Sequence, residues 1–164
     1  MRLAPLSELD AEEARLWRNA RLDALRTPYP LTKEQQLDWH YTHTGKWWSI
    51  EEGNALVGYG GIQHIQWESR IGELSLLMHP KETARRGAAL DLILCEAFLT
   101  MNLTIIYAEV YECNRDAVWW SLEAKRRGAI EVELPTRKFY QGQYWDSVYY
   151  SFDRDAYASI DNVS

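Results

Sequence analysis

A short basic loop separates a strand-like segment from a helix-like segment near the middle of the 164-residue chain. The strand pattern stops before Pro80, the loop runs from Lys81 to Gly87, and an apolar helical pattern begins at Ala88. The free N–H groups in the first turn of a helix and the helix dipole both favour an anion. Arg85 and Arg86 would add side-chain cations. The segment predicts a site for a small anion, although every strand–loop–helix crossover offers a similar cradle.

Two glutamates lie inside apolar strand patterns. Glu73 falls in segment 71–78 and Glu109 in segment 104–112. Burying a carboxylate without a partner is costly, so each acid indicates either a proton-transfer role or a structural one. The structural alternatives are a strand edge that faces solvent and a salt bridge to Arg18, Arg70 or Arg115.

Other combinations of reactive residues are weak. The histidines show no spacing typical of metal ligands, so we expect no metal site. No Ser-His-Asp order and no phosphate-binding P-loop are evident. Cys95 and Cys113 cannot form a disulfide framework, and we interpret both as reduced thiols in a cytoplasmic protein.

The composition is typical of a globular protein, with 46% hydrophobic and 26% charged residues. No apolar run approaches the roughly 20 residues that cross a bilayer, so we expect no membrane association. The net charge of −6 does not favour binding along a nucleic acid. The cations gather in three short clusters, which suit a small anion better: Arg85-Arg86, Lys125-Arg126-Arg127 and Arg137-Lys138.

Periodicity predicts which elements position these groups. Helices are expected at 7 to about 25, 32 to 45, 88 to 101 and 114 to 127, with Asn114 capping the last. Strands are expected at 46–52, 55–67, 71–78, 104–112, 130–138 and 143–152. A strand–helix–strand unit in the middle predicts one parallel crossover within a mostly antiparallel sheet. With no linker or repeat, we expect one domain over 1–164.

Six segments, taken in order, resemble one family. They are LWRN (16–19), LTKEQQLDWH (31–40), GELSLLMHP (72–80), ALDLILCEAF (89–98), AEVYECNRDAV (108–118) and GQYWDSVYYSF (142–152). Together they resemble the GNAT superfamily of acyl-CoA N-acyltransferases over nearly the whole chain. The first two are similar to the branch that acetylates ribosomal-protein N-termini and nucleotide-linked amino sugars.

The resemblance implies an α/β (α+β) GNAT fold. Its single mixed, mostly antiparallel sheet would have about six to seven strands and about four flanking helices, and it would splay between segments 71–78 and 104–112. Acetyl-CoA, the co-substrate, would lie in the splay. The implied cofactor-binding residues are Leu76, Leu77, Met78, Arg85, Arg86, Gly87, Ala88 and Asn114. A backbone N–H near Leu77 or Met78 would hold the oxyanion of the tetrahedral intermediate.

The resemblance also implies catalytic residues. Glu109 matches the catalytic glutamate of the N-terminal acetylating enzymes, and Glu73 matches a glutamate that acts as a base or water holder in many relatives. Ser121 stands where the family often has a tyrosine that protonates the leaving thiolate. The phosphate loop departs from the family pattern because Ala84 occupies its leading Arg/Gln position.

The expected activity is direct transfer of an acetyl group from acetyl-CoA to a primary amine. The acceptor would be a small-molecule amine (a nucleotide-linked amino sugar or a modified-base amine) or a protein N-terminus. The alternative is a catalytically inactive GNAT domain that binds acyl-CoA or a protein partner. Aromatic residues either line an acceptor cleft or serve the core and a homodimer contact: Trp17, Tyr29, Trp39, Trp47 and Trp145.

Overall fold

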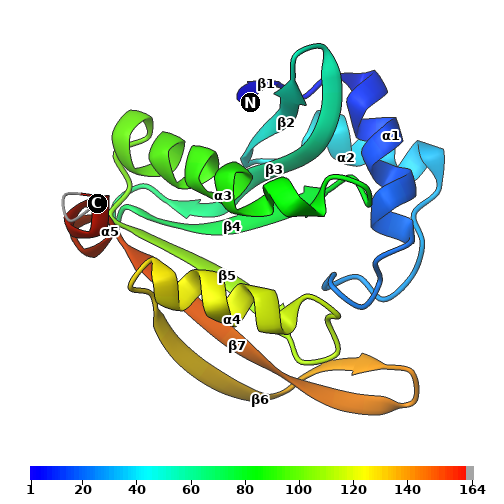
Figure 1. Cartoon of the computed structure of the whole chain (residues 1–164). Coiled ribbons are helices and arrows are strands. Elements are labelled where there is room, and N and C mark those ends of the chain that lie inside the picture. The colour runs from blue at the N-terminus through cyan, green and yellow to red at the C-terminus, as the bar shows by residue number, and fades with distance from the viewer. Residues whose placement is uncertain (162–164) are drawn as a thin grey trace.

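One seven-stranded sheet organises the chain in a computed structural model that describes residues 1–161 (Figure 1). The strands lie in the order β1-β2-β3-β4-β5-β7-β6, and every neighbouring pair is antiparallel except β4 and β5. Their bounds are Arg2–Pro5 (β1), Lys46–Glu52 (β2), Ala55–Gln66 (β3), Ile71–Met78 (β4), Ile105–Tyr111 (β5), Ile130–Tyr140 (β6) and Gln143–Asp153 (β7). The predicted mixed, mostly antiparallel sheet is confirmed. The short strand β1 was missed.

Within residues 1–161, five α-helices flank the sheet, against about four expected. They are α1 (Glu8–Asn19), α2 (Lys33–Thr42), α3 (Arg86–Cys95), α4 (Ala117–Arg126) and α5 (Arg154–Asp161). A 3₁₀ turn at Thr83–Arg85 precedes α3, and a π turn at Glu96–Thr100 continues it. No helix within residues 1–161 is long and apolar enough to span a membrane.

Local capping explains where two helices start. Ser7 accepts the N–H of Asp10 at 3.1 Å and begins α1. Thr32 and Gln35 form the predicted capping box of α2, with each side chain accepting the other residue's backbone N–H.

Three helix ends differ from the prediction. The helix α1 stops at Asn19 instead of about residue 25, because the Asn19 amide exchanges two hydrogen bonds with the backbone of Leu31 and folds the intervening chain back. The helix α2 stops at Thr42, three residues early. The helix α4 begins at Ala117, because Asn114 Oδ1 accepts the N–H of Asp116 in a turn that precedes the helix. Asn114 is therefore not its N-cap.

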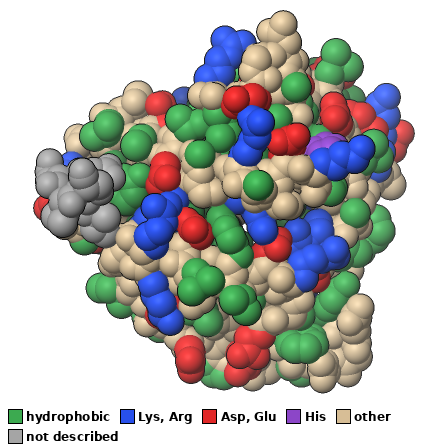
Figure 2. Space-filling view, viewed as in Figure 1, with side chains coloured by type: hydrophobic (Ala, Val, Ile, Leu, Met, Phe, Trp, Pro, Cys, Tyr) green, Lys and Arg blue, Asp and Glu red, His purple; other side chains and the backbone are tan. Residues whose placement is uncertain are grey.

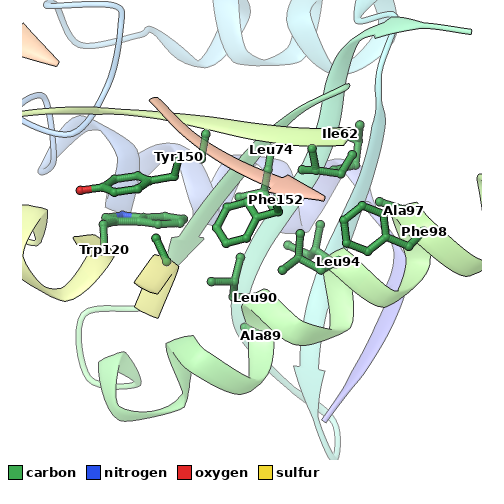
Figure 3. Close-up of a cluster of buried hydrophobic side chains, with 14 of the residues drawn as sticks. Ile62, Leu74, Ala89, Leu90, Leu94, Ala97, Phe98, Trp120, Tyr150 and Phe152 are labelled. Atoms are coloured by element: carbon green, nitrogen blue, oxygen red, sulfur yellow. The ribbon is translucent and has the colours of Figure 1, made fainter. Parts of the chain in front are cut away.

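The sheet separates two apolar clusters. The larger one lies under α3 and α4, where Phe152 and Leu90 are fully buried (Figure 3). The smaller one joins α1 to the opposite face through Trp17, Tyr59 and Leu77. Because side chains alternate along a strand, β4 directs Leu74 and Met78 to the α3 side and Leu77 to the α1 side.

The strands β4 and β5 separate soon after they meet. They pair only at Ile71–Ile105, Gly72–Ile106 and Glu73–Tyr107. Beyond Glu73, β4 stays paired with β3 as far as Met78, and β5 stays paired with β7 as far as Tyr111. Each strand thus keeps one complete ladder while its inner edge is free. The predicted splay is confirmed.

Candidate active site

A cavity of about 430 Å³ occupies the opening between β4 and β5. Its walls come from residues 73–78 of β4 and 108–111 of β5, from the chain between α1 and α2, and from the starts of α3 and α4. The cavity therefore has access to both faces of the sheet. Its α3–α4 side and its α1–α2 side carry different chemistry.

The α3–α4 side holds most of the expected cofactor contacts. Leu76, Leu77 and Met78 line the cavity along the free edge of β4. Asn114 lines it too and is nearly buried; its Oδ1 accepts from Arg21, whereas its Nδ2 makes no hydrogen bond within residues 1–161. That amide N–H is free to donate to a carbonyl in the cavity.

Arg86 lies at the start of α3 and lines the cavity. Its guanidinium is 2.7 Å from a carboxylate oxygen of Asp116 and 4.6 Å from the ring centroid of Trp119. No side chain caps the N-terminus of α3. A fixed cation beside an uncapped helix end is suited to a phosphate group.

Three expected phosphate contacts lie outside the cavity lining: Arg85, Gly87 and Ala88. The Arg85 guanidinium pairs instead with Glu52 at 3.0 Å and Glu82 at 3.1 Å. The carbonyl of Gly87 accepts a hydrogen bond from buried Arg127. Among the two neighbouring arginines, only Arg86 faces the cavity.

The cations of the other two basic clusters, at 125–127 and 137–138, also have partners within the protein. Arg127 pairs with Asp91 and Glu123. Buried Lys138 donates to the carbonyls of Leu22, Asp23 and Leu25. Neighbouring acids and carbonyls pair with these cations, so their contacts lie within the protein, and the sequence assigned neither cluster a ligand. On the face shown in Figure 2, acidic and basic side chains are interspersed and form no basic track.

The two glutamates share one face of the sheet. Glu73 is the register partner of Tyr107, and Glu109 lies two residues further along β5, so both side chains point to the α1–α2 side. Arg26, from the chain between the helices, joins them. Its Nη2 is 2.9 Å from Glu73 Oε1 and 2.7 Å from Glu109 Oε2. None of the arginines proposed from the sequence provides this ion pair.

Glu109 is saturated with donors. Besides Arg26, its other oxygen accepts from Arg137 at 3.0 Å and from Ser147 at 2.9 Å. Burial alone would raise the pKa of Glu109. The hydrogen bonds from Arg26, Arg137 and Ser147 outweigh burial, so the pKa of this carboxyl lies below its ordinary value. A carboxylate held in this way is an electrostatic anchor and a poor proton acceptor.

Glu73 has a different second partner. Its Oε2 is 2.6 Å from Nδ1 of His64, whose side chain is about half exposed and lines the cavity. His64 has a left-handed backbone (φ +49°) within the irregular end of β3, between Gln63 and Gln66. Such a conformation is costly for a non-glycine residue and is common at functional sites. The carboxylate fixes Nδ1 and leaves Nε2 of the imidazole available to a group in the cavity.

The chain between α1 and α2 is tied down beside the cavity. Asp23, which is buried, accepts from the side chain of Arg21 and from both the backbone and side chain of Arg115. The same segment receives Lys138 on its carbonyls. These bonds fix the segment that carries Arg26.

Asp23 gives a prediction on acid stability. Burial would raise the pKa of Asp23, but its hydrogen bonds with Arg21 and Arg115 lower it from 3.8 to about 2. Because the folded pKa is depressed, the stabilisation is present above pH 4 and is lost as the pH falls from about 4 to 2. D23N should therefore cost about 2 kcal/mol of unfolding free energy at pH 7 and flatten the pH dependence below pH 4, as measured by urea unfolding. Asp155→Asn, at an exposed position, should change neither; a pH-independent loss in D23N would contradict the assignment.

Ser121 does not reach the cavity. It is absent from the lining, and its Oγ lies 3.4 Å from Glu131 Oε1 on the other side of α4. This position contradicts the expectation that Ser121 meets the leaving thiolate. Three tyrosines line the cavity instead: Tyr29, Tyr59 and Tyr111.

Of the five aromatic residues suggested for an acceptor cleft, Tyr29, Trp39 and Trp47 line the cavity. Trp17 belongs to the small apolar cluster, and Trp145 donates to the carbonyl of Tyr140 in the β6–β7 hairpin. Sequence reasoning did not place Arg26 or His64 in the site. The sequence pattern gave little indication of either residue, because Arg26 lies in an irregular segment and His64 lies on a predicted strand. Within residues 1–161, no cluster of acidic, histidine or cysteine side chains could hold a metal ion.

Comparison with known proteins adds a family and a set of folds. Residues 9–119 match the family described as Acetyltransferase (GNAT) family. The structure of spermidine N-acetyltransferase from Vibrio cholerae, in complex with CoA and spermine, superposes with a TM-score of 0.85 at 18% identity and covers 95% of this chain and 96% of that one. A mutant structure of the spermidine/spermine N-acetyltransferase SpeG from the same organism gives 0.81 at 20% identity, covering 97% and 96%. No curated protein sequence matches the chain.

Proposed function

Since the chain belongs to the acetyltransferase (GNAT) family and is an acetyl-CoA-dependent N-acetyltransferase, we propose that residues 1–164 act as one catalytic domain that acetylates the primary amine of a small molecule. The opening between β4 and β5 carries this proposal. It supplies a free strand edge for the cofactor on the α3–α4 side and a glutamate–histidine pair on the α1–α2 side.

The pantetheine arm of acetyl-CoA would lie along β4. From Leu74 to Met78, no described residue of β5 pairs with this strand, so an extended amide chain can add to its edge as an extra strand does. The Asn114 Nδ2 faces the same cavity. Arg86 and the N-terminus of α3 would hold the diphosphate.

The transfer needs a neutral amine. Its nitrogen attacks the thioester carbon, and the C–N bond forms. The tetrahedral intermediate then collapses, the C–S bond breaks, and CoA leaves as a thiolate that takes a proton from solvent or from a tyrosine of the cavity. The nitrogen gives up one proton to a base. The negative oxygen of the tetrahedral intermediate would accept a hydrogen bond from a backbone N–H near Leu77 or Met78. We assign the base to Glu73 and His64. Leu77 lies four residues from Glu73, about 13 Å by strand rise, so the proton would reach the pair through water.

The acceptor class follows from the resemblance of segments 16–19 and 31–40. Among small molecules they favour a nucleotide-linked amino sugar or a modified-base amine, and a protein N-terminus is the alternative acceptor. The structural neighbours are polyamine acetyltransferases by their names, but at 16–20% identity they support the fold and not the acceptor.

Binding of acetyl-CoA tests the proposed cofactor-binding site. Isothermal titration calorimetry should show one site, and R86M should weaken it about 10-fold because a charge-assisted phosphate contact is lost. R85M is the matched control, because Arg85 is adjacent to Arg86, lies outside the cavity and pairs with Glu52 and Glu82. The affinity of R85M for acetyl-CoA should stay within about twofold of the wild type.

The outcomes distinguish an active acetyltransferase from an inactive domain that binds acyl-CoA. If acetyl-CoA neither binds nor raises the Tm, the acetyltransferase proposal is wrong. If it binds and no amine in a broad panel accelerates release of free thiol, the chain is the inactive acyl-CoA-binding alternative.

A further inference from the structure

Arg18 is a partly buried cation without a hydrogen-bond or ion-pair partner among residues 1–161, and it lines the α1–α2 side of the cavity. Its Nη1 is inaccessible to solvent and makes no hydrogen bond. Within residues 1–161, every other arginine side chain makes a hydrogen bond or an ion pair. A buried N–H group without an acceptor is costly, so the unpaired Nη1 of Arg18 beside a cavity calls for a ligand.

The fold holds Arg18 in place from both sides. Trp17 packs against Tyr59 and Leu77 in the smaller apolar cluster, and Asn19 exchanges two hydrogen bonds with the backbone of Leu31. The residues before and after Arg18 are thus fixed to different elements. Burial lowers the pKa of Arg18, and the nearby phenol groups of Tyr59 and Tyr29 only partly offset this effect.

The surroundings of Arg18 offer donors and aromatic faces. Trp47 lines the same cavity, and its Nε1 is also buried without an acceptor. Its ring lies 4.8 Å from Trp39, edge to face, and 6.0 Å from Tyr59, nearly stacked. Two unmatched donors in an aromatic wall are complementary to an acceptor-only group.

No acid of the cavity is available to neutralise Arg18. The acidic lining residues are Glu73, Glu109 and Asp116. Glu73 and Glu109 share Arg26, and Asp116 pairs with Arg21 and Arg86. Each acid of the lining thus already has a cation, and Arg18 is left without one.

We propose that Arg18, with the indole N–H of Trp47, binds an oxyanion carried by the acceptor amine, so that the preferred substrates are amines bearing a carboxylate or a phosphate. The inference rests on the proposed acetyl transfer and narrows its acceptor class. An arginine fork matches both oxyanions, and the aromatic residues would pack against the body of the acceptor.

Matched pairs of amines test the inference. Glucosamine 6-phosphate against glucosamine probes phosphate, and phenylalanine against phenethylamine probes carboxylate. Binding to the protein saturated with CoA is measured by calorimetry, and kcat/KM by release of free thiol from acetyl-CoA. The wild type should favour the anionic member of at least one pair by 10-fold or more. R18M should abolish that preference by weakening the anionic member alone.

R2M is the control for loss of one positive charge, because Arg2 lies on β1, is exposed and pairs with Glu51; it should keep the preference. The wild type should acetylate spermidine no better than the probes that lack an anionic group, glucosamine and phenethylamine. The inference is overturned if neither anionic probe is favoured, or if R18M keeps the preference. Because the calorimetric comparison uses CoA and needs no turnover, it decides the role of Arg18 even if the acetyl transfer itself is absent.

Discussion

Replacing Glu73 by glutamine is expected to lower kcat/KM for amine acetylation by about 100-fold, while acetyl-CoA still binds. Glutamine keeps the shape of the side chain but cannot take a proton or orient His64 through a charged hydrogen bond. Removal of a positioned general base typically costs 10²- to 10⁴-fold. Steady-state kinetics between pH 6 and 9, with acetyl-CoA affinity from calorimetry, provide the measurement.

E109Q is the matched control, because Glu109 faces the same side and shares Arg26. Its carboxylate is committed to Arg26, Arg137 and Ser147, so we expect a loss of less than about 10-fold and no change in the shape of the pH profile. H64Q should resemble E73Q in that profile. If E109Q is the more damaging variant and E73Q is nearly normal, the base assignment is reversed.

Replacing Arg26 by methionine is expected to destabilise the fold by about 2 kcal/mol at pH 7. The variant leaves two nearly buried carboxylates facing each other without the cation between them, and breaking a buried ion pair typically costs 3 to 5 kcal/mol. The value is reduced here because the Arg26 side chain is 49% exposed and because Arg137 and His64 still contact the acids. Urea unfolding at several pH values measures the loss.

The loss of unfolding free energy in R26M should depend on pH, and its direction can be predicted. In R26M the two carboxylates repel, so one of them holds a proton more tightly in the folded protein than in the unfolded chain. Such a group stabilises the fold at low pH and loses that contribution as the pH rises. The deficit of R26M relative to the wild type should therefore shrink between pH 7 and 5. R137M, which removes a cation from Glu109 alone, should show a smaller and flatter deficit; equal deficits would contradict the central place of Arg26.

The local sequence pattern was sufficient to predict most strands of the sheet. The strands β2 and β4 have the predicted bounds, because alternation and the turns at Gly53 and at 68–70 are encoded in neighbouring residues. The capping box at Thr32 was likewise local. The strand β1 and the helix α5 were missed, since each is short and depends on pairing or docking at a chain end.

The sequence by itself determined the chemical inventory and the family: two acids in central strands, a helix directly after a basic loop, and motifs in the right order. Only the tertiary structure decided which groups act together. Arg26 and Arg18 come from an irregular segment and a helix face that are distant from Glu73 in the chain. His64 lies only 9 residues from Glu73, but an irregularity in β3 brings its ring to the carboxylate. A carboxylate's partner is set by distance in space. For the same reason, Arg85, which the resemblance made a cofactor-binding residue, pairs with nearby acids and lies outside the cavity lining.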